Sequence, residues 1–145
     1  PAVTDAVIAL GRSDSILRVR DHLAAGGCVG ILADRLLAED SDRAQVLDFL
    51  GRPARFPLGP YRLAALLGAP VVFMAGIYLG GNRYHLQFAP IADFAGFAGL
   101  DAAERDAAST QALQAFVAQL QAQCRQAPWN WFNYYAFWDS ADAPP

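Results

Sequence analysis

The stretch CVGILADR at residues 28–35 decides the fold that the sequence predicts. Residues 28–33 are apolar at every position, and the run ends abruptly in Asp34 and Arg35. A short run that is apolar on both faces is typical of a strand in a parallel sheet covered by helices. We therefore expect a buried strand that ends at an acid and an arginine.

The segments around this strand alternate between helix and strand. The predicted elements, in chain order, are a helix at residues 14–25, the strand at 28–33, a short apolar piece at 46–50, a helix at 61–67, a buried strand at 71–78, its hairpin partner at 84–88 and a long helix from Asp101 to Pro128. This order is typical of an α/β protein. The prediction is one domain over residues 1–145, with a mixed, mainly parallel sheet flanked by helices.

Composition excludes several classes of protein. The chain has 145 residues, 54% hydrophobic and 17% charged, which argues against disorder. A net charge of −3 gives no basic surface for nucleic acid. All 11 basic residues are arginines, so a bound anion must be held by guanidinium groups or backbone N–H groups. Cys28 and Cys124 are expected to be buried thiols, with no disulfide and no metal site.

No segment is apolar for the roughly 20 residues that span a bilayer. The longest apolar stretch is residues 69–79. The chain begins at Pro1 without a signal-like region, so we expect a soluble piece of a longer protein.

Asp34 and Arg35 are the first candidate site. Ligands of open α/β sheets gather at the C-terminal ends of strands. There an acid can orient an arginine that faces an anion. The alternative is a local ion pair at a strand end.

A second candidate site is the predicted helix start at Gly59-Pro60-Tyr61-Arg62, where free N–H groups and the helix dipole favour an anion. Phe56 and Leu58 lie just before it in sequence. The alternative here is an ordinary turn with solvated arginines.

Neither histidine has the partner that a general base needs. The residue five positions after His22 is a glycine, and the residue five positions after His85 is a proline. Both are expected to be structural or surface residues. No serine lies in a nucleophile elbow, and no cluster has metal-ligand spacing.

The C-terminal segment at residues 128–139 is rich in aromatic side chains, including Trp131 and Phe132. Three interpretations stay open. The segment packs on the sheet as core, lines an apolar groove, or lies at a membrane interface.

Five short stretches occur together in one order: GILADR (30–35), FLGRPA (49–54), FPLGP (56–60), APVV (69–72) and WFNY (131–134), the last followed by Phe137 and Trp138. Together they resemble the bacterial lipid A biosynthesis lauroyl/myristoyl acyltransferases, a branch of the glycerolipid acyltransferase superfamily. The resemblance covers about residues 10 to 139 and corresponds to the C-terminal half of that fold.

The resemblance implies that a fatty acyl chain moves from acyl carrier protein or acyl-CoA, as co-substrate, to a hydroxyl of a lipid A precursor or related lipid, at the cytoplasmic face of the inner membrane. A His-x4-Asp/Glu motif supplies the base in this family, and it is absent from these 145 residues. Arg35, beside Asp34, is implied to hold acceptor phosphate. The implied phosphate site also includes Gly59 and Arg62, and the implied acyl-groove residues are Phe56, Leu58, Trp131 and Phe132.

Two functions from different classes stay open. The chain is part of an acyltransferase and inactive alone, or it is a non-catalytic lipid-binding or docking module built from the same fold. A third possibility is an unrelated α/β domain. The expected partners are a lipid acceptor, acyl carrier protein, a membrane surface reached through other parts of the protein, and a second copy of the chain, because a cut sheet exposes apolar surface and strand edges.

Overall fold

The computed structural model describes residues 7–8, 14–36, 44–134 and 136–138. It divides into two compact units, residues 1–32 and 33–145. The first unit contains helix α1 (Ser15–Ala24). It follows Asp14 and is closed by Gly26, whose φ of 80° lies in the left-handed region that glycine adopts without strain. The predicted helix at 14–25 is confirmed.

The predicted buried strand at residues 28–33 is wrong. These residues have no strand structure, Cys28 is exposed, and Leu32 is 73% exposed. A strand that is apolar on both faces becomes stable only between partner strands, which satisfy its backbone groups. Among the described residues no strand pairs with this segment. The prediction that Cys28 is buried fails for the same reason, whereas Cys124 is buried as expected.

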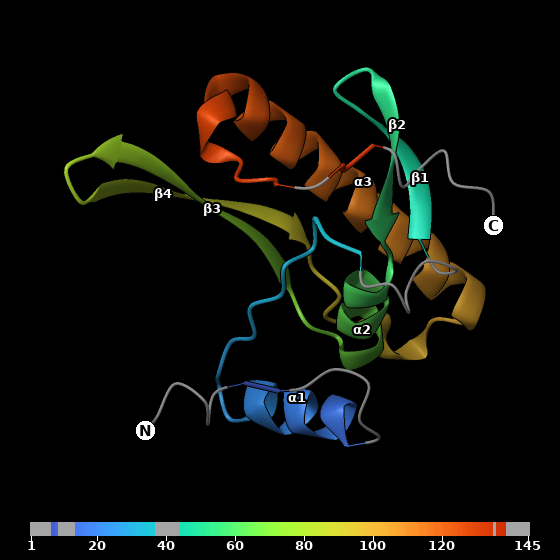
Figure 1. Cartoon of the computed structure of the whole chain (residues 1–145). Helices are drawn as coiled ribbons and strands as arrows, with labels where there is room; N and C mark the ends of the chain where they lie inside the picture. The colour runs from blue at the N-terminus through green and yellow to red at the C-terminus, as the bar shows by residue number, and fades with distance from the viewer. Residues whose placement is uncertain (1–6, 9–13, 37–43, 135, 139–145) are drawn as a thin grey trace. The chain divides into compact units, whose positions relative to one another are not determined.

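In the second unit, the long helix α3 (Ala102–Gln126) is the central element. It contacts helix α2 (Gly59–Leu67), the strands β1 (Ala44–Phe49), β3 (Val71–Gly80) and β4 (Arg83–Ala92), and the 3-10 turn η4 (Pro128–Asn130) (Figure 1). A further 3-10 turn, η3 (Phe97–Gly99), contacts α2.

The ends of α2 and α3 are set by local sequence, as predicted. Pro60 lies in the first turn of α2, and Gly68 closes that helix with a φ of 63°. Asp101 and Glu104 form a capping box on α3, each side chain accepting from the other residue's backbone N–H at 2.9 Å. The buried face of α3 has the predicted spacing, with Leu113, Val117, Leu120 and Cys124 inside.

Both sheets are antiparallel hairpins. Strand β1 pairs with β2 (Arg52–Pro57), and β3 pairs with β4. The turn of the first hairpin is Leu50-Gly51, with φ of 57° and 84°, as a two-residue turn of type I′ requires. The mixture of helix and strand agrees with the prediction. The mainly parallel sheet does not appear among the described residues.

The core of the second unit is strongly aromatic. Phe49 and Phe56 are fully buried, and Phe49 packs edge-on against Phe56 with ring centroids 5.5 Å apart. The apolar face of α3 covers this core. The other fully buried large side chains include Tyr61, Phe94, Leu58 and Leu113. Within the described part of the chain, no helix is long and apolar enough to cross a bilayer.

Candidate functional site

Asp34, the first predicted site residue, is tied to the C-terminal aromatic segment. The indole Nε1 of Trp131 donates a hydrogen bond to its Oδ2 at 3.2 Å. These residues are 97 positions apart in sequence. Trp131 follows η4, which turns the chain back after α3 ends. Asp34 is half-buried, so this bond orients a carboxylate with limited access to water.

Arg35 contacts the same segment from the exposed side. Its Nη2 lies 3.5 Å from the carbonyl oxygen of Phe132, at the long limit of a hydrogen bond. Its side chain is exposed. A guanidinium group has five N–H donors, so this weak contact leaves donors that can meet an anion. The structure thus brings together Asp34, Arg35, Trp131 and Phe132, as four of the predicted site residues.

Trp131 is held in place by aromatic neighbours from two parts of the chain. Its ring centroid lies 5.3 Å from that of Phe49 and 5.0 Å from that of Phe137. The indole of Trp138 donates to the carbonyl of Phe49 at 3.2 Å, and Arg52 lies over the Trp138 ring at 5.5 Å. These contacts fix the positions of Trp131 and the aromatic side chains around it, which we call the aromatic wall.

The aromatic segment is partly core and partly exposed. Phe137 is buried, whereas Trp129 and Tyr134 are each 88% exposed. The interpretation as core holds for one side of the segment. Phe132 is 54% exposed and stacks on Tyr134 with ring centroids 6.4 Å apart, which leaves an aromatic surface next to Arg35.

The charge of Asp34 acts on Tyr61, which the sequence did not predict. Burial, and then the negative charge of Asp34, raise the pKa of its phenol far above the ordinary value. Its hydroxyl is buried and has no hydrogen-bond partner among the described residues. Burial and Asp34 also raise the pKa of the Cys124 thiol to about 11, so this cysteine is a poor nucleophile.

The start of α2 was the second predicted anion site. The amides of Tyr61 and Arg62 already donate to the carbonyl of Leu58, and Pro60 has no amide hydrogen. The Arg62 Nε donates to Asp106 of α3 at 2.6 Å. Gly59 is exposed at the first position of the helix. The structure therefore joins Arg62 to a carboxylate of α3.

Two of the predicted acyl-groove residues lie in the core. Phe56 is fully buried, with its ring 5.7 Å from Phe137, and Leu58 is 2% exposed. Of the predicted acyl-groove residues, Trp131 and Phe132 are the two that reach a surface. A role for Phe56 and Leu58 toward an acyl chain stays a prediction.

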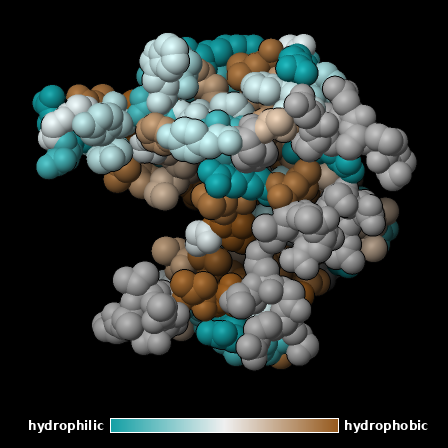
Figure 2. Space-filling model, in the orientation of Figure 1, coloured by the Kyte–Doolittle hydropathy of each residue, from teal (hydrophilic) through white to brown (hydrophobic). Residues whose placement is uncertain are grey.

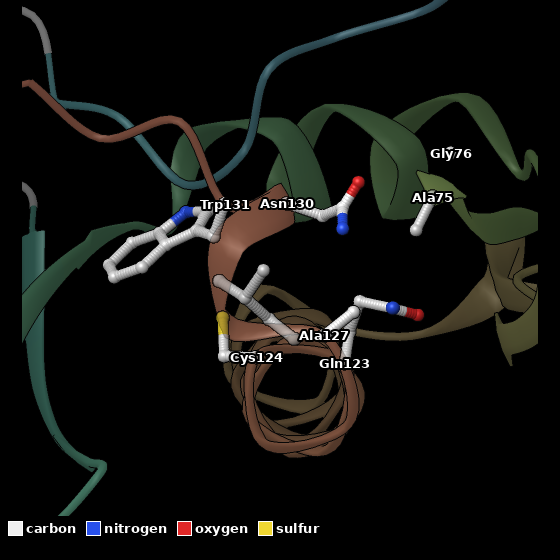
Figure 3. A pocket seen from close by; sticks show the side chains of 8 residues that line it. Ala75, Gly76, Gln123, Cys124, Ala127, Asn130 and Trp131 are labelled. Carbon is white, nitrogen blue, oxygen red and sulfur yellow. The ribbon is translucent and has the colours of Figure 1, made fainter. Parts of the chain in front are cut away.

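A pocket of about 170 Å³ lies between strand β3, the end of α3 and η4. Figure 3 shows the amides of Gln123 and Asn130 on one side of it and Trp131 and Cys124 on another. The Nε2 of Gln123 is buried without a partner among the described residues, and Asn130 accepts from the Tyr78 amide at 2.6 Å. A dry cavity of about 150 Å³ admits a guest the size of benzene. This pocket is therefore too small for a whole fatty acyl chain.

The two histidines were expected to be structural or surface residues. His22 in α1 contacts the carbonyl of Cys28 at 3.2 Å, and His85 is exposed on β4. In the described ranges of the chain, no three His, Cys, Asp or Glu side chains lie together as metal ligands would.

Sequence reasoning missed the surroundings of Asp34. Tyr61 lay inside the predicted segment 59–62, but the effect of the Asp34 charge on its phenol depends on tertiary packing. One signal was available: Tyr61 and Ala65 are four residues apart, which places both on the buried face of α2. Cys124 was predicted on the apolar side of its helix and not beside Asp34.

The described fold and site define a mixed helix–strand domain that holds an exposed arginine and a half-buried acid against an aromatic wall. The chain matches the family model of bacterial lipid A biosynthesis acyltransferases over residues 6–135. It belongs to this family. No curated protein and no solved structure matches it.

Proposed function

We propose that this chain takes part in moving a fatty acyl chain to a hydroxyl of a lipid A precursor, or of a related glycolipid or lysophospholipid. Acyl carrier protein or acyl-CoA is the proposed donor. In the reaction, the acceptor hydroxyl attacks the thioester carbonyl, the ester bond forms, and the thiol leaves with the proton that the hydroxyl lost. The proposed place of this reaction is the cytoplasmic face of the inner membrane.

The role proposed for these residues is to hold the acceptor. One observation supports it best: the exposed guanidinium of Arg35 lies beside an aromatic surface, next to an Asp34 carboxylate that Trp131 orients. Guanidinium groups bind phosphate through paired N–H donors. The stacked rings of Phe132 and Tyr134 offer an apolar neighbour to a lipid. Arg35 is thus the proposed phosphate ligand.

The proton of the acceptor hydroxyl needs a general base, and we propose that residues other than these 145 supply it. Neither His22 nor His85 has an acid five positions later. Asp34 already accepts the Trp131 indole hydrogen, which orients it as part of the wall. The chain alone should therefore bind acceptor without transferring an acyl group.

The test is an assay of the 145-residue chain with acyl-CoA and a lipid A precursor, in which binding and transfer are both measured. We expect binding of the precursor and no acylated product. Acyl transfer that Arg35→Ala abolishes would show that these residues contain the whole catalytic machinery. Absence of both binding and transfer would remove the proposed role of the site.

A non-catalytic lipid-binding module is the second candidate function. The observation that favours it is that neither histidine is followed by an acid five positions later, as the base of the family motif would be. An acyl-transfer assay of the chain mixed with a polypeptide that contains the family's His-x4-Asp/Glu motif distinguishes the two functions. Restored transfer that depends on Arg35 supports the acyltransferase, and binding without transfer supports the module.

A further inference from the structure

In the second unit, one face of the β3–β4 hairpin is apolar along its whole length and is not covered by the described residues of that unit. The cross-strand pairs on this side are Val72 with Pro90, Met74 with Phe88, Gly76 with Leu86, and Tyr78 with Tyr84. We refer to these eight residues as the hairpin face. Apart from Gly76 and Pro90, the residues of the hairpin face are each between 46% and 66% exposed. In Figure 2 the tip of the hairpin is hydrophilic, and side chains of intermediate and hydrophobic character lie behind it.

The opposite side of the same hairpin is the one that packs on the domain. Phe73 and Ile77 are buried, and the Phe73 ring lies 5.6 Å from that of Phe116 in α3. Strand residues alternate between faces, so the hairpin face points away from this core. A two-stranded hairpin is marginal alone, and a sheet with one covered face and one apolar exposed face is an interaction surface.

We propose that the hairpin face packs against the hairpin face of a second copy of this chain. The side chains, each about half to two-thirds exposed, offer on the order of 600–700 Å² per copy, since an aromatic side chain alone covers about 150–250 Å². Two such faces packed about 10 Å apart bury roughly 1,300 Å² in total. A stable, specific interface needs about 1,200–2,000 Å². The area is therefore sufficient for a dimer.

The chemistry of the hairpin face selects a second copy over a lipid surface. A two-fold interface must be complementary to itself, and a face without any charged residue meets this condition because no like charges face each other. An anionic membrane attracts amphipathic surfaces that are rimmed by Lys and Arg. Here the hairpin contains one arginine, Arg83 at the turn, and no lysine, and the chain has a net charge of −3.

The test is sedimentation equilibrium of the 145-residue chain, with a reductant to prevent a disulfide through the exposed Cys28. We expect a dimer, with twice the chain mass of 15.6 kDa, at micromolar concentration. Leu86→Glu buries an unpaired charge twice per dimer and should raise the dissociation constant at least ~100-fold. Leu66→Glu is the matched control, because Leu66 on α2 is 60% exposed and Leu86 is 59% exposed.

Circular dichroism of both variants shows whether they stay folded. Phe88→Thr is a milder variant that places a β-branched residue, which favours strands, at this position and should also weaken the dimer. A wild-type monomer across this concentration range contradicts the proposal, as does equal dissociation by Leu66→Glu. Binding to vesicles of anionic phospholipid by a monomer, lost in Leu86→Glu, also contradicts it and assigns the face to lipid. None of these outcomes depends on whether Arg35 binds phosphate.

Discussion

Asp34 is half-buried among groups that respond to its charge. Its carboxylate accepts from Trp131, and its charge adds to the larger effect of burial in raising the pKa of both Tyr61 and Cys124. An ionised acid in such surroundings needs its hydrogen bonds, because an unsatisfied buried charge is costly. Removing the hydrogen bond from Trp131 therefore tests how much it contributes to the stability of the C-terminal segment.

Trp131→Phe should lower the free energy of unfolding by about 1–2 kcal/mol. An aromatic ring remains, although the smaller phenyl makes fewer contacts, and the carboxylate of Asp34 loses its donor. At this half-exposed site we expect a loss at the low end of the roughly 1.5–3 kcal/mol that hydrogen bonds to charged groups contribute. Urea denaturation followed by circular dichroism measures the change. Trp129→Phe is the control, because Trp129 is 88% exposed and should change stability by less than about 0.5 kcal/mol. Equal losses in the two variants would contradict a specific role for the Asp34 bond.

The Arg62–Asp106 ion pair should respond to acid. The hydrogen bond from Arg62 lowers the pKa of Asp106 below its ordinary value of 3.8. Because the pKa of Asp106 is lower in the folded state than in the unfolded state, the ion pair adds to the free energy of unfolding above pH 3.8. This contribution is lost as the pH falls through the lowered pKa. In Arg62→Ala the pKa of Asp106 should rise toward 3.8. NMR titration of the carboxyl carbon measures it, and an unchanged pKa in this variant means that the pair is absent in solution.

Local signals predicted the helices well. Gly68 closes α2 and Asp101 starts α3 because caps depend on neighbours within four residues. The β1–β2 hairpin was not predicted. Its Leu50-Gly51 turn lacks the usual Asn-Gly or Asp-Gly pair, and the Leu50 amide donates to Gln121 of α3 at 2.7 Å. A turn supported by a distant side chain leaves little trace in the local sequence.

The strand predicted at 28–33 failed for a related reason. Hydrophobicity marks which residues can be buried, but the partner strands decide whether a strand forms. Within 71–80 the strand was predicted correctly, since its hairpin partner follows directly through Gly80-Gly81-Asn82. The prediction that this strand is buried holds for one face only, because alternate residues such as Met74 are exposed.

At the scale of elements, the capping box of α3 gives a direct prediction. Asp101→Ala should lower the free energy of unfolding by about 1 kcal/mol, because the amide of Glu104 loses its acceptor. Asp101→Asn should retain most of the stability, since asparagine caps helices about as well as aspartate. Thermal and urea denaturation of both variants measure the difference. Similar losses in the two variants would mean that the cap bond adds little.

At the scale of the whole molecule, the candidate site depends on contacts that sequence alone did not reveal. Asp34 and Arg35 were chosen as a strand end, and they lie instead in a turn and loop against residues 131–132. The residues were identified through their order along the chain and the family resemblance. Asp34 and Trp131 are 97 positions apart, and they come into contact because α3 and η4 return the chain to Asp34.

The central claim is that Arg35 recognises the phosphate of a lipid acceptor. The most direct measurement compares the affinity of the chain for a phosphorylated lipid A precursor and for its dephosphorylated form, in the wild type, in Arg35→Ala and in Arg125→Ala. The last is a control, because Arg125 is exposed in the final turn of α3.

We expect the wild type and Arg125→Ala to prefer the phosphorylated lipid by about 10-fold or more, as a charge-assisted hydrogen bond of roughly 1.5–3 kcal/mol requires. Arg35→Ala should bind both lipids equally. An Arg35→Ala chain that keeps the full preference for phosphate would contradict the account.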